Sequence, residues 1–142
     1  MKPRALSALY RAAFPDARPW STAEFAGLLA RPETILAEAQ QGFALGRVIA
    51  DEAELITLAV HPHARRRGLG RSLLARFEAE AGARGARSAF LEVAADNGPA
   101  MALYLQAGWR ESGRRKGYYA RRGQPAADAL TLQKSLPVAP PG

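Results

Sequence analysis

Cysteine is absent from the 142-residue sequence, which excludes disulfide bonds, thiol catalysis and cysteine-ligated zinc. Histidine is nearly as scarce, because His61 and His63 are the only two and they flank Pro62. Two histidines without a third ligand nearby make a poor metal site. We therefore expect no bound metal and interpret this segment as a turn after a strand.

Long apolar runs are also missing. No uninterrupted stretch approaches the ~20 residues that a membrane-spanning helix needs. The N-terminal residues, Met1–Arg4, begin a mixed segment that lacks the apolar core of a secretion signal. These absences predict a cytoplasmic protein that does not associate with membranes. The length favours a single domain, which we expect over residues 1–136, followed by a disordered proline-rich tail over residues 137–142.

Negative charge is under-represented, and the formal net charge is +7. The excess is mostly arginine, gathered at residues 65–67, 114–116 and 121–122. An anionic partner would suit this charge, but a GC-rich genome that favours arginine could produce much of the excess with no function. Aromatic residues are not interleaved with these clusters as a nucleic-acid stacking platform requires, so we expect no direct nucleic-acid binding. A phosphate-rich small molecule explains the first cluster better.

The first half of the chain reads as two helices followed by three strands. Apolar spacing predicts a helix over Ala5–Ala13, stopped by Pro15. Ser21 and Glu24 have the spacing of a capping box, which predicts a second helix running to about Ala30. Three short strands with tight turns then predict an antiparallel meander: Thr34–Ala39, Phe43–Ala50 and Glu54–Val60.

The second half alternates between helices and strands. Leu69, Leu73 and Phe77 recur every four residues, which predicts an amphipathic helix ending at Gly82 or Gly85. The remaining expected elements are a strand at Ser88–Val93, a helix at Asn97–Ala107, and strands at Trp109–Lys116 and Ala127–Lys134. The order of these elements after a meander predicts an α/β fold with a mixed sheet.

The segment richest in chemistry is the turn that leaves the third strand and opens the amphipathic helix. Gly68 and Gly70 lack the β-carbons that would keep a pyrophosphate away from the backbone, and helix N-termini attract phosphate. Arg65, Arg67 and Arg71 supply positive charge around them. The segment does not match the Walker phosphate-binding motif, because no Lys-Ser/Thr pair follows the last glycine. It does not match the dinucleotide-binding motif either, because the third glycine is missing. Alternatively, the glycines only shape a strand-to-helix connection.

The order of motifs resembles the GNAT superfamily, and within it the ribosomal-protein-alanine N-acetyltransferases of the RimI type. The motif Arg-x-x-Gly-x-Gly at Arg65–Gly70 is similar to the acetyl-CoA motif of that superfamily. Further matching segments follow in one register over roughly residues 5–136: Pro19-Trp20-Ser21, Phe90–Val93, Asn97, Ala102–Tyr104, Ala107–Trp109 and Arg114–Tyr119. Only Met1–Arg4 precede the first helix, so the strand that usually opens the family's fold is expected to be missing or vestigial.

This resemblance implies a mixed central sheet in which a meander is followed by strand, helix, strand and helix, with acetyl-CoA as co-substrate. It also implies that one strand splays from its neighbour, so that the backbones of Leu58 and Val60 can pair with the cofactor. Asn97 matches a cofactor-contacting position, although a plain helix cap would explain it equally. The residues implied to bind the cofactor are Leu58, Val60, Arg65, Arg66, Arg67, Gly68, Gly70, Arg71 and Asn97.

The resemblance also implies direct attack of an amine on the acetyl thioester. Glu92 matches the general base, and a carboxylate in an apolar strand is costly unless needed or paired, although it could simply face solvent. Tyr104 matches the general acid, since tyrosine is protonated near neutral pH, although a core aromatic is the alternative. Tyr118 and Tyr119 fall where the family binds peptide, or else pack on the sheet as a hairpin pair.

The acceptor implied by the resemblance is the N-terminal α-amine of a protein, specifically the N-terminal alanine of a small-subunit ribosomal protein. An acetyltransferase acting on another small amine or protein terminus remains open, because substrate loops vary more than the cofactor site. A non-catalytic acyl-CoA sensor and a nucleic-acid-binding module are alternatives from other functional classes. The presence of both Glu92 and Tyr104 argues against an inactive enzyme.

Overall fold

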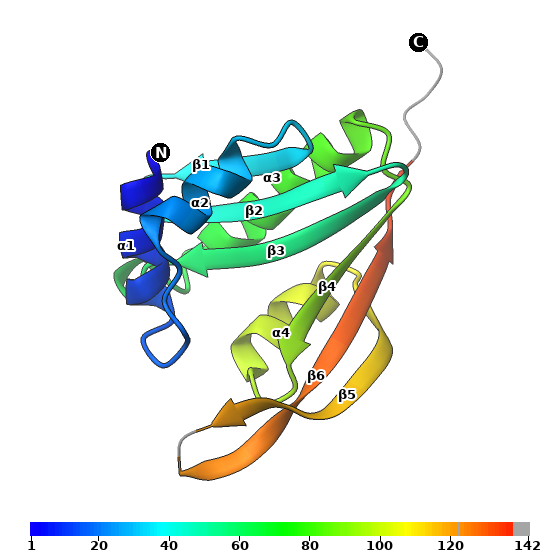
Figure 1. The fold of residues 1–142 in the computed structure, drawn as a ribbon. Coiled ribbons are helices and arrows are strands. Elements are labelled where there is room, and N and C mark those ends of the chain that lie inside the picture. The colour runs from blue at the N-terminus through cyan, green and yellow to red at the C-terminus, as the bar shows by residue number, and fades with distance from the viewer. Residues whose placement is uncertain (122, 138–142) are drawn as a thin grey trace.

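The chain folds into a sheet with helices on both faces in the computed structural model, which describes residues 1–121 and 123–137 (Figure 1). The predicted tail therefore lies outside the described residues except for Pro137, as does Arg122 of the third arginine cluster. The elements are α1 (Pro3–Ala13), α2 (Thr22–Leu29), β1 (Thr34–Ala39), β2 (Gly42–Ile49), β3 (Glu52–Val60), α3 (Leu69–Ala83), β4 (Ser88–Ala94), α4 (Gly98–Gln106), β5 (Arg110–Arg121) and β6 (Gln124–Ser135).

The two N-terminal helices cover one face of the sheet (Figure 1). The predicted capping box of α2 is confirmed, since Ser21 Oγ accepts the Glu24 N–H at 3.1 Å and Glu24 Oε1 accepts the Ser21 N–H at 3.2 Å. Leu6 and Phe25 are fully buried against Phe43 on the sheet. No strand precedes α1 in the described chain.

The sheet has six strands in the order β1-β2-β3-β4-β6-β5. The first three strands pair antiparallel in sequence order, so the predicted meander is confirmed. The only parallel neighbours in the described sheet are β3 and β4, which α3 connects across the other face. The last strand, β6, lies between β4 and β5 and pairs antiparallel with both. The mixed α/β architecture predicted from the order of elements is therefore confirmed.

β3 and β4 pair over only three residues each and then diverge. The paired positions are Glu52–Glu54 with Ser88–Phe90, although β3 continues to Val60 and β4 to Ala94 (Figure 1). β3 also carries a bulge, because Leu55 and Thr57 face the consecutive residues Gly46 and Leu45 of β2. A bulge bends its strand and increases the local twist. The splayed strand implied by the resemblance is therefore present.

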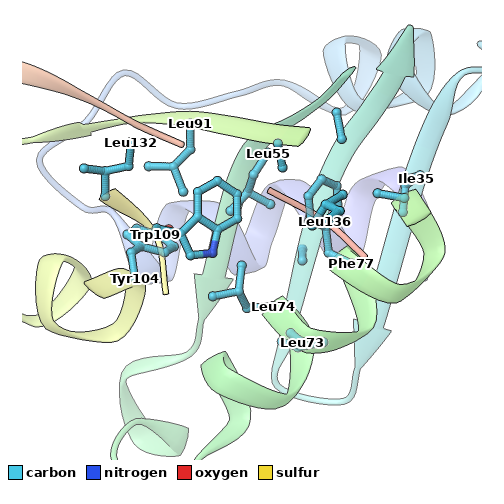
Figure 2. Close-up of a cluster of buried hydrophobic side chains, with 14 of the residues drawn as sticks. Ile35, Leu55, Leu73, Leu74, Phe77, Leu91, Tyr104, Trp109, Leu132 and Leu136 are labelled. Carbon is cyan, nitrogen blue, oxygen red and sulfur yellow. The ribbon is translucent and has the colours of Figure 1, made fainter. Parts of the chain in front are cut away.

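The main core lies between the sheet and the helices α3 and α4. Trp109 is fully buried there beside Leu74, Leu91 and Leu132 (Figure 2). Its indole Nε1–H donates to Glu78 Oε2 at 3.2 Å. Glu78 in turn pairs with Lys134, whose ammonium also donates to the Ala107 carbonyl at 2.6 Å. This partly buried network satisfies the polar groups at the junction of α3, β6 and the turn after α4.

Several element boundaries differ from the predictions. The first helix begins at Pro3 rather than Ala5, because proline is favoured in the first turn of a helix. The last two strands span residues 110–121 and 124–135, longer than the predicted 109–116 and 127–134. β5 follows β6 through three register irregularities, two of which lie at or beyond Lys116, where the predicted strand ended. Sequence alternation fails at such irregularities, which is why the prediction ended early.

Gly46 is expected to tolerate no side chain. A β-carbon there would overlap the Glu54 carbonyl and the Phe77 ring. Gly46→Ala should therefore lower the free energy of unfolding by about 1–3 kcal/mol, the range for overpacked cores. Gly27→Ala is the control, because its β-carbon would meet nothing within 4 Å and alanine favours the helix. Urea denaturation checks both, and a Gly46→Ala variant as stable as the Gly27→Ala variant would contradict the packing.

Candidate functional site

The connection between β3 and α3 adopts backbone conformations that side chains disfavour. Pro62–Ala64 forms a short 3-10 turn in which His61 Nδ1 accepts the His63 N–H at 3.1 Å. Arg66 then takes φ 65°, and Gly68 takes φ 78°. A non-glycine residue in the left-handed region is held there at a cost of order 1 kcal/mol. The two histidines therefore form the predicted turn, and the strained backbone marks the loop as a candidate functional element.

The first turn of α3 presents unused backbone donors. Gly68 is the N-cap and has no side chain to accept a hydrogen bond, while the first intrahelical donor is the Ser72 N–H, which reaches Gly68 O at 3.0 Å. The N–H groups of Leu69, Gly70 and Arg71 thus have no partner within the helix. A β-carbon on Gly68 would meet nothing within 4 Å, so the space over this turn is open. Such a helix end suits a phosphate group.

The arginines of this segment divide into two groups. Arg66, Arg67 and Arg71 are exposed and form no hydrogen bond or ion pair with any other described residue. The guanidinium of Arg65 instead donates to the Ala13 carbonyl at 2.8 Å, which anchors the loop to the end of α1. Three unpaired guanidinium groups therefore surround the open turn, while Arg65 also has a structural contact that its sequence position did not reveal.

Leu58 and Val60 lie on the part of β3 that has left β4. They pair with Ala44 and Gly42 of β2 on one edge, and their side chains are half-buried against the main core. Leu55 also contacts this core, although it is three residues from Leu58 and a regular strand would turn these two side chains to opposite faces. The bulge between them brings both side chains to the same face. Backbone groups on the β4 side of residues 55–60 lack a partner strand. An extended ligand could therefore pair with this edge.

Glu92 faces away from the main core and contacts a residue that the sequence did not single out as functional. Leu91 and Val93 are buried in the core, so Glu92 between them points to the opposite face. Its Oε1 lies 3.4 Å from Nη2 of Arg115, and about a third of its side chain is exposed, at 32%. The carboxylate is thus both paired and accessible. Its partner comes from β5, two strands away, and only the strand order could have identified it.

Tyr104 lies on the core side of β4. Tyr104 is only 7% exposed, and the centroid of its ring lies 6.1 Å from that of Trp109 (Figure 2). Burial raises the pKa of Tyr104 to about 12, so its hydroxyl is protonated at neutral pH. No hydrogen bond joins this hydroxyl to another described residue. The core interpretation is therefore confirmed, and the hydroxyl remains an available proton donor.

Asn97 lies at the start of α4, and Tyr118 and Tyr119 lie toward the end of β5. Asn97 is the N-cap of α4, where its side chain accepts the Ala100 N–H at 3.3 Å, so the cap interpretation is confirmed. Tyr118 and Tyr119 pack edge to face, with ring centroids 5.2 Å apart. Tyr118 is 52% exposed, which leaves its ring accessible to a partner. Contact of any of these residues with a ligand stays a prediction.

The described residues contain no cluster of three or more histidine, aspartate or glutamate side chains able to hold a metal ion. Within that same part of the chain, the helices are all too short or too polar to cross a membrane.

The predicted catalytic pair lies on the two faces of β4, with the Glu92 side chain on one face and Tyr104 on the other. The predicted phosphate-binding turn follows the diverging end of β3.

Comparison with known proteins identifies similar chains. The profile of the Acetyltransferase (GNAT) family matches residues 4–109. The chain is 39% identical over 105 residues to the [Ribosomal protein bS18]-alanine N-acetyltransferase of Escherichia coli strain K12, covering 71% of each chain. The crystal structure of the Escherichia coli ribosomal-protein-S18-alanine N-acetyltransferase superposes with a TM-score of 0.85 at 31% identity, covering 97% of this chain and 90% of that one.

A third similarity concerns the fold alone. The structure of yncA from Salmonella typhimurium, which contains its cofactor acetyl-CoA, superposes with a TM-score of 0.80 at 21% identity. The match covers 96% of this chain and 89% of that one.

The raised pKa of Tyr104 predicts a specific alkaline response. In the unfolded chain the hydroxyl ionises near pH 10, whereas in the folded state it stays neutral up to about pH 12. Stability from this burial is present below pH 10 and is lost between pH 10 and about 12, by about 3 kcal/mol in total. Tyr104→Phe should remove this part of the pH dependence in urea denaturation. Tyr118→Phe, at an exposed ring, is the control, and equal slopes for all three proteins would contradict the burial.

Proposed function

The chain belongs to the GNAT family of acetyltransferases, and on that basis we propose that it moves an acetyl group from acetyl-CoA to the N-terminal α-amine of a protein. The proposed acceptor is the N-terminal alanine of ribosomal protein bS18, the protein in the name of its Escherichia coli relative. The single observation that carries the proposal is the position of Glu92 and Tyr104 on opposite faces of β4, where β4 has parted from β3.

The residues around the β3–α3 turn fit acetyl-CoA. A pyrophosphate needs several N–H donors and nearby positive charge, and the first turn of α3 offers both, with Arg66, Arg67 and Arg71 around it. The unpaired edge of β3 at Leu58 and Val60 suits the amide groups of a pantetheine arm. When bound, acetyl-CoA would supply an activated acetyl thioester.

Glu92 and Tyr104 divide the proton transfers. An α-amine is largely protonated near pH 7 and must lose a proton before it can attack. Glu92, paired but accessible, accepts that proton directly or through water. A bond then forms between the amine nitrogen and the carbonyl carbon, the carbon–sulfur bond breaks, and the neutral Tyr104 hydroxyl donates a proton to the sulfur. The nitrogen releases its second proton to solvent, Tyr104 regains a proton from solvent, and Glu92 returns its own to solvent. The products are an acetylated terminus and CoA.

The position of the two groups also lets each of them serve a different substrate. Because Glu92 points away from the core and Tyr104 into it, the acceptor and the thioester can approach β4 from different faces. Each proton then moves over a short path on its own side. Separate approach of the two substrates favours direct transfer without a covalent enzyme intermediate.

Mass spectrometry of a peptide copying the bS18 N-terminus tests the proposal. Incubation with acetyl-CoA and the protein should add one acetyl group, and fragment ions should place it on the α-amine of alanine. Glu92→Gln should lower kcat by about 10²–10⁴-fold, the usual contribution of a general base, with acetyl-CoA affinity unchanged. Glu80→Gln is the control, because Glu80 is an exposed carboxylate of α3 that pairs with Arg84.

Three results would count against parts of the proposal. Loss of acetyl-CoA binding in Glu92→Gln would assign Glu92 a structural role. Full activity of that variant would remove it from the reaction. An unmodified peptide in the presence of bound acetyl-CoA would move the acceptor to another amine and leave the family assignment intact.

A further inference from the structure

The β5–β6 hairpin contains a bulge beside the proposed acceptor site. Arg115 faces Ala129 and Tyr119 faces Ala127, so three residues of β5, Lys116–Tyr118, oppose the single residue Asp128 of β6. Gly117 within the bulge takes φ 61°, a conformation that glycine adopts without strain. Bulges of this kind bend a strand and re-aim its side chains.

The carboxylate of Asp128 holds this bulge at two points. Its Oδ1 accepts the Gly117 N–H at 2.9 Å, and its Oδ2 accepts from Nη1 of Arg114 at 2.8 Å. These two donors, Gly117 first and then Arg114, hold the pKa of Asp128 below its ordinary value. Arg114 has a second partner, Glu111, at the longer distance of 3.4 Å. The contact specific to the bulge is therefore the one between Asp128 and the Gly117 amide.

The bulge changes the position of Tyr119 along the hairpin. Without the two extra residues, Gly117 would oppose Ala127, and Tyr119 would lie two positions, or about 7 Å, farther along the hairpin. With them, Tyr119 and Arg115 share the face of the sheet that carries Glu92, because Glu92 pairs with Thr131 in the same alternation. The bulge thus draws an aromatic residue toward the proposed base.

Arg115 connects the bulge to Glu92 directly. It is the last residue in register before the bulge, and its side chain crosses β6 over Ala129 to reach the carboxylate. Its guanidinium carbon also lies 5.1 Å from the centre of the Tyr118 ring, within the range of a cation–π contact. Arg115 therefore links the ring of Tyr118, within the bulge, to the carboxylate of the proposed base.

We propose that Asp128 is a positioning residue for the acceptor: by holding the Lys116–Tyr118 bulge, it places Tyr118 against the Arg115 that pairs with Glu92, with Tyr119 next to Tyr118, and so sets the affinity for the peptide. This inference rests on the proposed function, since it assumes that the acceptor amine binds at Glu92. It leaves the acetyl-CoA side untouched, because the β3–α3 turn shares no residue with the hairpin.

Steady-state kinetics with the alanine-first peptide test the inference. Asp128→Ala removes both hydrogen bonds and should raise the peptide KM roughly tenfold, as expected for losing a bond to a charged group. The KM for acetyl-CoA should stay within twofold. Asp128→Asn keeps an oxygen for the Gly117 N–H and should recover most of the peptide affinity. Glu111→Gln is the control, because it removes the negative charge of the other partner of Arg114 without touching the bulge.

The outcomes separate this inference from its premise. A peptide KM that is unchanged in Asp128→Ala, with only a lower unfolding midpoint, would overturn the positioning role. An equal rise in Glu111→Gln would overturn it as well, since the effect would then belong to Arg114. Failure of the wild-type protein to acetylate any amine-terminated peptide would instead overturn the proposed function on which the inference rests.

Discussion

The parallel contact between β3 and β4 extends over only three residue pairs, and the arrangement of the site depends on where it stops. A longer ladder would satisfy the backbone of residues 55–60 and leave no edge for a ligand. It would also bring the far end of β4 against β3 and enclose Glu92. The bulge at the Leu55–Thr57 step bends β3 at the point where the ladder ends. The same bulge makes Leu55 and Leu58 contact one core, so packing fixes the divergence.

Helices on both faces hold the diverging strands in place. On one face α1 and α2 bury Leu6 and Phe25, and the Arg65 contact with Ala13 ties this layer to the β3–α3 loop. On the other face α3 packs along β2 and β3, while α4 carries Tyr104 beside β4. The proposed phosphate-binding turn and the proposed proton donor therefore belong to different helices. Because each helix is fixed by its own packing, the positions of both groups are set before any ligand arrives.

Local signals in the sequence were sufficient to predict the helices, the meander and the glycine-containing turn that opens α3. Ser21 and Glu24 announce a helix start because the capping box depends on a spacing of three. Gly68 and Gly70, after the arginines, likewise predict a helix start, and one whose first turn has no side-chain cap. The contact of Arg115 with Glu92 could not be predicted, because it depends on β6 lying between β4 and β5. The Lys116–Tyr118 bulge could not be predicted either, because it depends on how β5 pairs with β6 and on the contact with Asp128 of that strand.

Amide hydrogen exchange with and without acetyl-CoA tests the central claim most directly, namely that the unpaired edge of β3 and the first turn of α3 bind the cofactor. If the cofactor binds there, amide hydrogens of residues 55–60 and 69–71 should exchange more slowly when acetyl-CoA is present, and those of the β1–β2 turn, residues 40–41, should be unchanged. Protection confined to the β5–β6 hairpin, or uniform across the sheet, would contradict it.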